Sequence, residues 1–156
     1  MTLFLLRHAE AEFMTGPDGD ISRELTIRGQ SQISRLAKLL DKNQIKFDSV
    51  LSSNAKRTRQ STEILTNVIF AKKIHFLREL YEADPHQMLS IINQVGLEVD
   101  NLLVVGHNPT ISALVSYLTG EKFISIQPGM MARIEIHTGN WNEVGRGTGT
   151  LLEILQ

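Results

Sequence analysis

The sequence predicts an α/β fold: a mostly parallel mixed sheet with helices on both faces and an antiparallel hairpin at one edge. Short apolar runs alternate with segments of helical periodicity over the first two thirds of the 156 residues. These runs are continuous rather than alternating, which is typical of parallel strands buried on both faces. The last third instead holds two strand-like segments joined by a turn. Strand–helix alternation indicates a parallel sheet covered on both sides, to which the hairpin adds an antiparallel edge.

The first elements are a strand at residues 2–6, a polar loop at 13–24 that contains Gly and Pro, and a helix that follows Thr26. We expect Thr26 to cap this helix, because its hydroxyl can accept a hydrogen bond from a free N–H of the first turn. Apolar residues then recur at roughly helical spacing. They are Ile27, Ile33, Leu36, Ala37, Leu39 and Leu40.

The next elements repeat this alternation. A strand at 47–51 precedes a helix from about 55 to 70, and a weaker strand follows at 73–77. Pro85 fits the first turn of another helix, where its missing N–H costs nothing. A buried strand at 101–105 leads into a last helix, for which Gly120 is a plausible stop.

The predicted hairpin pairs residues 130–137 with 148–155 through a turn that contains Trp141. We expect Trp141 to be exposed at the tip of the hairpin. The segment 145–149 resembles a phosphate-binding loop at first sight, but it lacks the Lys-Ser/Thr pair and leads into a strand. It is therefore predicted to be a turn.

Length and composition predict a single globular domain over residues 1–156, with 42% hydrophobic and 21% charged residues. A net charge of −1 argues against nucleic acid or an anionic membrane as a partner, because no global field attracts them. The absence of cysteine excludes disulfides, thiolate catalysis and Cys-ligated zinc. The apolar start is too short for a signal peptide, and no run reaches the ~18 apolar residues of a membrane span. These features predict a cytoplasmic protein.

Three polar clusters follow predicted strands, at residues 7–10, 52–57 and 106–109. Binding sites of open α/β sheets form beyond the carboxyl ends of the strands, where parallel strands bring such clusters to one edge. Two arginines and two histidines would meet there. They are Arg7, His8, Arg57 and His107.

This combination favours an anion over a metal ion, because two guanidinium groups repel a cation. Guanidinium forks match phosphate oxygens, and the helix start near Arg57 can add backbone donors. A neutral imidazole can attack phosphorus, and neighbouring positive charge favours the neutral form of His8. Each residue alone also has a structural interpretation: His8 as a satisfied loop or core histidine, Arg57 as a solvated helix residue, His107 as a helix cap.

Four segments in order resemble the motifs of the histidine phosphatase superfamily, which includes the phosphoglycerate mutases. They are the Leu-Leu-Arg-His-Ala-Glu-Ala run at 5–11, the Leu-Thr-x-x-Gly run within 23–29, the Ser-Ser-x-x-x-Arg run within 52–61 and the Gly-His-Asn-Pro run within 104–109. Within this superfamily the chain is most similar to SixA-like phosphohistidine phosphatases. Ala9 replaces the usual glycine after the histidine, and Asn54 stands where proline is common.

The resemblance implies a three-layer α/β/α sandwich and no metal or organic cofactor. It implies that His8 is phosphorylated transiently while Arg7, Arg57 and His107 hold the phosphoryl oxygens. Glu79, in a Leu-x-Glu run, is the candidate acid that protonates the leaving group, and Glu82 is its competitor. SixA-like enzymes need such an acid less, because the P–N bond of phosphohistidine is labile.

The proposed substrate is phosphohistidine on a protein, for example a histidine-containing phosphotransfer domain, because the chain has little length after Glu79 for an insertion over the pocket. A small-molecule phosphomonoesterase or mutase on the same scaffold is one alternative, and a non-catalytic phospho-binding module is another. Asp18, Asp20 and Glu24 either line the pocket rim and select against extra negative charge or belong to a solvated loop. The remaining histidines are expected to have surface or packing roles: His75, His86 and His137.

Overall fold

The computed structural model describes residues 1–13 and 17–156. Its centre is one six-stranded sheet with the strand order β3-β2-β4-β1-β5-β6. The neighbours β3, β2, β4 and β1 are parallel, whereas β5 and β6 pair antiparallel at one edge, so the predicted mixed sheet with its edge hairpin is confirmed. The strands are β1 (Thr2–Arg7), β2 (Phe47–Ser53), β3 (Ala71–Leu77), β4 (Asn101–Gly106), β5 (Met131–Ile136) and β6 (Gly149–Leu155).

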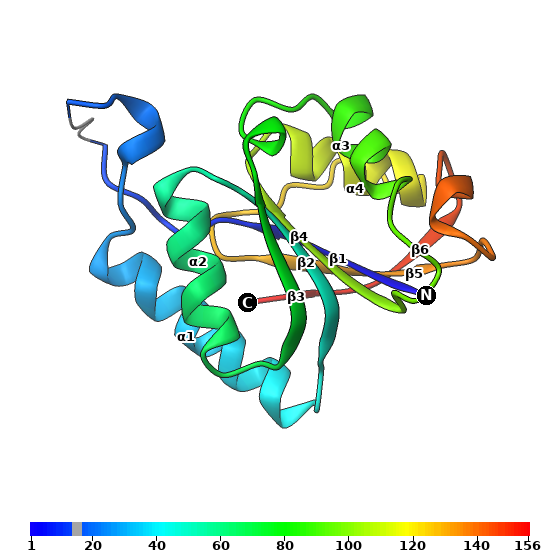
Figure 1. Cartoon of the computed structure of the whole chain (residues 1–156), viewed down its shortest axis with the longest axis horizontal. Helices are drawn as coiled ribbons and strands as arrows, with labels where there is room; N and C mark the ends of the chain where they lie inside the picture. The colour runs from blue at the N-terminus through cyan, green and yellow to red at the C-terminus, as the bar shows by residue number, and fades with distance from the viewer. Residues whose placement is uncertain (14–16) are drawn as a thin grey trace.

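Helices cover both faces of this sheet, as Figure 1 shows. In β1, Leu3 and Leu5 belong to one apolar core, whereas Phe4 and Leu6 belong to the other. Successive side chains of a strand point to opposite faces, so a strand buried on both faces is apolar at every position. The three-layer arrangement is therefore as expected. Its helices are α1 (Ile27–Lys42) and α2 (Lys56–Thr66) on one face, and α3 (Pro85–Ile92) and α4 (Thr110–Thr119) on the other.

The helix ends follow local chemistry. The Thr26 hydroxyl accepts a hydrogen bond from the Gly29 N–H at 2.9 Å, and α4 ends at Gly120 with a φ of 76°, as the sequence predicts. Asp84 and Gln87 form a capping box at the start of α3. Among the helices of the described residues, none is long and apolar enough to cross a membrane.

Two details of the predicted helices are wrong. The second helix ends at Thr66 rather than near residue 70, because β3 already begins at Ala71, where it pairs with Phe47. Ile27 does not belong to the apolar stripe of α1 and is 85% exposed. It lies six residues before Ile33, which at ~100° per residue places it about 240° around the helix from the core side.

The expected exposure of Trp141 is also wrong. The connection between β5 and β6 folds back on the sheet as a short 3-10 helix, Trp141–Glu143, and the indole is completely buried. Its Nε1–H donates to the carbonyl oxygen of Val99 at 2.7 Å. The Asn93 side chain donates to the carbonyl oxygens of Trp141 and Val144, at 2.6 and 3.0 Å. A long connection can cover the end of a sheet, which a short hairpin loop cannot.

The glycine-rich segment 145–149 is a turn, as predicted. The Thr148 N–H donates to the carbonyl oxygen of Gly145 at 3.2 Å, and the Thr148 hydroxyl accepts from the Gly145 N–H at 3.0 Å. This closed turn leads directly into β6, so it carries no helix at which a phosphate group would bind.

Candidate active site

The three polar clusters lie at the carboxyl ends of adjacent parallel strands. Arg7 ends β1, and His8 follows it; Arg57 stands in the first turn of α2, just after β2; His107 follows β4. Because β2, β4 and β1 are neighbours in the sheet, these ends meet at one edge. The Nε of Arg57 lies 3.3 Å from the Nε2 of His8, and its Nη2 lies 3.3 Å from the Nδ1 of His107. The structure thus brings together residues that are 49 and 50 positions apart in the sequence.

The start of α2 is held in place by buried hydroxyl groups. The Thr58 hydroxyl donates to the carbonyl oxygen of Ser53 at 2.7 Å, and the Thr62 hydroxyl donates to the Ser52 hydroxyl at 3.0 Å. The Ser61 hydroxyl accepts from the Ala9 N–H at 3.2 Å, which ties α2 to the segment after β1. Buried polar groups that are all paired make a rigid network. This network sets the position of Arg57 relative to His8.

The hydrogen bonds determine which ring nitrogens carry protons. A guanidinium group only donates, so the Nε2 of His8 must accept from Arg57. The Nδ1–H of His8 then donates to the carbonyl oxygen of Ala9 at 2.7 Å. By the same argument, the Nδ1 of His107 accepts from Arg57, and its Nε2–H donates to the Ser53 hydroxyl at 2.8 Å. The lone pair of the His8 Nε2 is therefore directed at the Arg57 guanidinium.

Both histidines are neutral at neutral pH. Burial lowers the pKa of His8 to about 4, opposed by the carbonyl oxygen of Ala9 and reinforced by the positive charges of Arg57 and Arg7. Burial also lowers the pKa of His107 to about 3, with further contributions from His8 and Arg57. The predicted effect of positive charge on His8 has the right direction, but burial is the larger cause.

Arg7 offers an unpaired donor at this edge. Its Nη1 donates to the carbonyl oxygen of Ile126 at 3.2 Å, whereas its buried Nε has no hydrogen-bond partner among residues 1–13 and 17–156. Leaving a buried charged donor unpaired is costly. Arg57 is also deeply buried, with 6% of its surface exposed. Two guanidinium groups beside two neutral imidazoles form a site suited to an anion such as a phosphoryl group.

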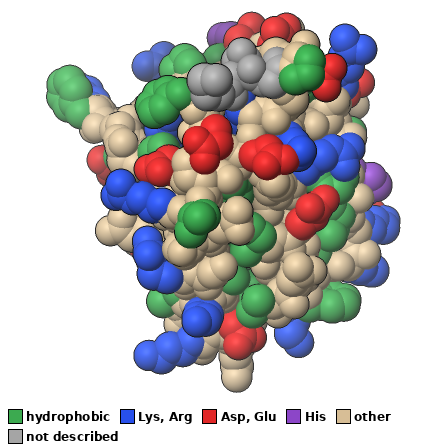
Figure 2. Space-filling view, turned by 90° about the vertical axis from the view of Figure 1, so that its left-hand side faces the viewer, with side chains coloured by type: hydrophobic (Ala, Val, Ile, Leu, Met, Phe, Trp, Pro, Cys, Tyr) green, Lys and Arg blue, Asp and Glu red, His purple; other side chains and the backbone are tan. Residues whose placement is uncertain are grey.

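The interspersed surface charges of the protein agree with a local anion site. Lys, Arg, Asp and Glu side chains mix on the face shown in Figure 2, without a patch of one sign. The net charge is −1. The positive charge that suits an anion is therefore local to the arginine–histidine cluster and is not a property of this face of the molecule.

A fifth residue of the site, Asp20, comes from the segment that the sequence analysis left as a pocket rim or a solvated loop. It begins a 3-10 helix, Asp20–Ser22, and is bonded to Arg57 twice. The Nη2 of Arg57 donates to the Asp20 carboxylate at 3.0 Å, and its Nη1 donates to the Asp20 carbonyl oxygen at 2.8 Å. Tyr81 and Arg23 also donate to this carboxylate, at 2.6 and 2.9 Å. Asp20 is thus held on Arg57 by fixed contacts, although 46% of its side chain is exposed.

The other residues of this predicted loop have different surroundings. Asp18 is exposed and, like Asp20, borders a surface hollow of about 580 Å³. Glu24 forms an ion pair with Lys56, at the start of α2. Residues 14–16 of the predicted loop lie outside the described residues. Of the three acidic residues named from the sequence, only Asp20 bonds an arginine of the pocket.

Glu79 and Glu82, the two candidate acids, are both exposed. They line the same hollow of about 580 Å³ that Asp18 and Asp20 border, and Tyr81 also borders it. Within the part of the chain that the structure describes, neither glutamate forms a hydrogen bond or ion pair with His8 or His107. The role of an acid at either position stays a prediction. Between them, Tyr81 packs its ring against His107, with centroids 5.7 Å apart.

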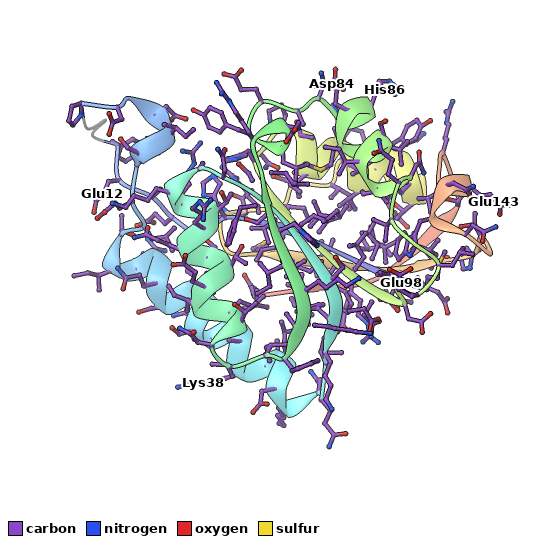
Figure 3. All side chains as sticks on the ribbon, in the orientation of Figure 1. Glu12, Lys38, Asp84, His86, Glu98 and Glu143 are labelled. Carbon is purple, nitrogen blue, oxygen red and sulfur yellow. The ribbon has the colours of Figure 1, made fainter. Side chains whose placement is uncertain are left out.

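The remaining histidines lie at the surface, as expected. His86 lies on the outside of α3 beside the labelled Asp84 in Figure 3, His75 is exposed on the edge strand β3, and His137 is exposed with its Nε2 2.7 Å from the Thr150 hydroxyl. Among the described residues, no group of three or more His, Cys, Asp or Glu side chains is placed to hold a metal ion.

Comparisons with known proteins give both relatives in sequence and solved structures with a similar fold. An uncharacterised protein of Mycobacterium leprae is 36% identical over 118 residues, which are 74% of this chain and 71% of that protein. The structure of a candidate phosphohistidine phosphatase SixA from Nakamurella multipartitia is similar over 99% of this chain and 95% of its own, with a TM-score of 0.87 and 26% identity. A candidate SixA from Agrobacterium tumefaciens is similar over 99% and 97%, with a TM-score of 0.83 and 27% identity.

A family model gives the assignment directly. Residues 3–91 match the model of the histidine phosphatase superfamily, branch 1. This range contains Arg7, His8 and Arg57, and it ends before β4 and His107. The match and the similar structures support the same conclusion: the chain belongs to the histidine phosphatase superfamily.

Proposed function

We propose that this chain is a phosphohistidine phosphatase that removes the phosphoryl group from a histidine of a protein, through a phosphohistidine intermediate on His8. One observation carries the proposal: the unprotonated Nε2 of His8 faces the Arg57 guanidinium, 3.3 Å away, in a pocket that His107 and Arg7 share. A nucleophile needs its lone pair free and its target anion held beside it. The Arg57 group that hydrogen-bonds this lone pair is also the donor for the phosphoryl oxygens, so binding of the anion to Arg57 frees the lone pair beside phosphorus.

The first step transfers the phosphoryl group to the enzyme. Arg57 and Arg7 bind the phosphoryl oxygens through their guanidinium groups, which turns phosphorus toward the Nε2 of His8. The Nε2 lone pair forms the new P–N bond as the bond to the leaving group breaks. The Nδ1–H of His8 remains on the Ala9 carbonyl oxygen, so the positive charge that develops on the ring is stabilised.

The second step is hydrolysis of this intermediate. Water attacks phosphorus, the bond between phosphorus and His8 breaks, and inorganic phosphate leaves as H₂PO₄⁻ with the oxygen and both protons of the water. The electron pair of the broken bond returns to Nε2, which restores the neutral imidazole. A bound phosphoryl dianion also favours protonation of the His107 Nδ1. The protonated Nδ1 then donates to the phosphoryl group rather than accepting from Arg57.

The proposed substrate rests on the leaving group and on similarity. Imidazole is a better leaving group than an alkoxide, so phosphohistidine does not require a strong acid at Glu79 or Glu82. The two SixA-named structures, 26% and 27% identical, support phosphohistidine as the substrate group. A histidine-containing phosphotransfer domain is the proposed partner, because it carries phosphohistidine on an accessible surface.

Trapping the intermediate tests the reaction. The enzyme is mixed with a phosphorylated phosphotransfer domain, quenched in alkaline denaturant, and digested for mass spectrometry. We expect one phosphoryl group on His8 in the wild type and none in His8→Asn. Wild-type turnover without phosphate on His8 would refute the nucleophile.

A substrate series tests the specificity. We expect kcat/KM for the phosphorylated domain to exceed that for 3-phosphoglycerate and other small phosphate esters. A preference for a small ester by orders of magnitude would instead favour a small-molecule phosphatase, and transfer to a second hydroxyl would favour a mutase. Equal binding of the phosphorylated domain by wild type and His8→Asn, with hydrolysis by neither, would favour a phospho-binding module.

A further inference from the structure

We propose that Asp20 determines leaving-group specificity: its carboxylate, held on Arg57 by Tyr81 and Arg23, favours phosphoryl groups carried by a protonated nitrogen base over those carried by an oxygen. This inference rests on the proposed function, because it concerns the group that leaves when His8 attacks. It adds a residue, Asp20, whose effect on the leaving group neither the sequence motifs nor the arginine–histidine cluster assign.

The position of the Asp20 carboxylate is well determined by its contacts. One oxygen accepts from the Arg57 Nη2 at 3.0 Å and from the Tyr81 hydroxyl at 2.6 Å. The other oxygen accepts from the Arg23 Nη1 at 2.9 Å, while the Arg23 Nε donates to the carbonyl oxygen of Glu12. A carboxylate has about four lone-pair sites, so three donors leave room for one more. A substrate N–H can take that place.

Asp20 is an anion whenever the enzyme works. The hydrogen bond from Tyr81 is the largest of the effects that hold the pKa of Asp20 well below its usual range. Burial opposes it, and Arg23 and Arg57 act in the same direction as Tyr81. Such a carboxyl group cannot protonate an oxygen leaving group at neutral pH, so Asp20 is not a substitute for the acid expected at Glu79.

The carboxylate also lies where a leaving group has space. Asp20 and Tyr81 border the hollow of about 580 Å³, and both contact the arginine–histidine cluster, since the Arg57 guanidinium carbon lies 5.9 Å from the centre of the Tyr81 ring. They therefore form the wall between the anion site and the hollow. If the phosphoryl group lies at His8 and the leaving group extends into the hollow, the leaving group contacts Asp20 and Tyr81.

A fixed anion at that wall affects different substrates in opposite ways. An ester develops negative charge on its leaving oxygen in the transition state, which the Asp20 carboxylate repels. Phosphohistidine is cleaved in the form whose second ring nitrogen is protonated, and this cationic ring is attracted by the carboxylate and can donate to it. The same carboxylate thus favours binding of phosphohistidine in its protonated, cleavable form, which raises kcat/KM for a P–N bond, whereas it raises the barrier for a P–O bond.

The transfer step is balanced without any added acid. The lone pair of the His8 Nε2 forms a bond to phosphorus, and the electron pair of the substrate P–N bond returns to the substrate nitrogen. The substrate ring, cationic before the step, leaves as neutral imidazole with its remaining N–H directed at Asp20. The His8 ring becomes cationic and keeps its Nδ1–H on Ala9. No proton moves, so an ionised Asp20 is sufficient.

The test compares two substrates on matched variants. We measure kcat/KM for a peptide carrying 3-phosphohistidine and for p-nitrophenyl phosphate, with folding checked by circular dichroism. Asp20→Asn is expected to lose about tenfold on the phosphopeptide, the effect of one hydrogen bond between charged groups, and to gain severalfold on the ester. Tyr81→Phe, which removes one donor to the carboxylate, is expected to change the ratio in the same direction by less.

Asp18→Asn is the matched control, because it removes an equal charge from the rim of the same hollow without a hydrogen bond to Arg57. It is expected to leave the substrate ratio within about twofold of the wild type. Equal gains of Asp20→Asn on both substrates, with tighter vanadate binding, would mean that Asp20 only blocks the anion site. Equal losses would mean a structural role. Either result overturns the inference, while phosphate trapped on His8 would still support the proposed function.

Discussion

The two ends of the central sheet are built in opposite ways. At the carboxyl ends of the parallel strands, the chain buries charged and titratable groups such as Arg57 and His8, with 6% and 9% of their surfaces exposed. At the other end, the connection between β5 and β6 buries Trp141 completely and pairs its only polar atom with Val99. Burial of an ionisable group disfavours its charged form, whereas burial of an indole whose N–H is hydrogen-bonded stabilises the fold.

The difference indicates where the fold gains stability and where it gives some up. The Trp141 end contributes packing and satisfied hydrogen bonds. The His8 end holds two histidines whose pKa values burial lowers and a donor of Arg7 without a partner in the described residues. Unfavourable burial of polar groups is typical of functional sites, where the rest of the fold compensates for the lost stability. Substitutions at the two ends should therefore separate activity from stability.

The largest expected effect is that of His8→Asn. It removes the nucleophilic Nε2 and should lower kcat by about four orders of magnitude or more, since an enzyme without its nucleophile keeps only binding and electrostatic effects. The free energy of unfolding in urea should fall little or rise, because a buried imidazole beside two guanidinium groups is removed. If His8→Asn kept a tenth of the wild-type kcat, His8 would not be the nucleophile, and this end of the sheet would not be the catalytic one.

Arg57→Lys should have the second largest effect. A lysine keeps the charge but cannot reach His8, His107 and a phosphoryl group with one planar fork, so kcat/KM should fall by about 10²–10³. The matched control is Arg59→Lys on the same helix, where the guanidinium stacks over Phe76 away from the pocket. Equal activity of the two lysine variants would show that Arg57 supplies only charge.

The stability of the protein should fall in mild acid. The unfolded chain protonates its histidines near pH 6.5, whereas burial keeps His8 neutral to about pH 4 and His107 to about pH 3. The unfolded state therefore binds more protons in this window, and the free energy of unfolding should fall by roughly 2–5 kcal/mol between pH 7 and pH 4.5. Urea titrations measure it, and the double variant His8→Asn, His107→Asn should show a clearly weaker dependence. An equal dependence in both proteins would assign it to other groups.

Trp141→Phe should have the smallest effect, on stability alone. It leaves the carbonyl oxygen of Val99 without its donor and removes part of the packing, for a loss of about 2 kcal/mol at neutral pH. Leu97→Ala, an exposed side chain near the same end, is the control and should change stability by less than about 0.5 kcal/mol. Activity should be unchanged in both. Lost activity in the folded Trp141 variant would show that the two ends are coupled.

Local patterns explain which parts of the fold could be predicted. The apolar runs, the cap at Thr26 and the stop at Gly120 are signals carried by neighbouring residues, and the structure confirms each of them. The end of α2 was predicted too late, because the pairing of Phe47 with Ala71 decides where β3 must begin. Trp141 was predicted to be exposed, because its surroundings in the sequence are those of a turn.

The site shows the same division. Arg7, His8, Arg57 and His107 stand at the carboxyl ends of strands or a few residues beyond them, where a parallel sheet brings side chains together. Their convergence therefore follows from the topology. Asp20 and Tyr81 lie in connections, where no periodicity tells which charged group a side chain meets. An aspartate before an Arg-x-Leu-Thr run does not reveal that it bonds Arg57, 37 residues away.

The sequence by itself determined the order of strands and helices, the parallel topology, and the four strand-end residues, because periodicity and strand-end position are local properties. Only the tertiary structure decided the proton positions on His8 and His107, the pairing of Asp20 with Arg57 and the burial of Trp141. These depend on how far each connection folds back over the sheet and on which buried donor finds which acceptor. Such contacts are set by the packing of the whole chain, which no local pattern contains.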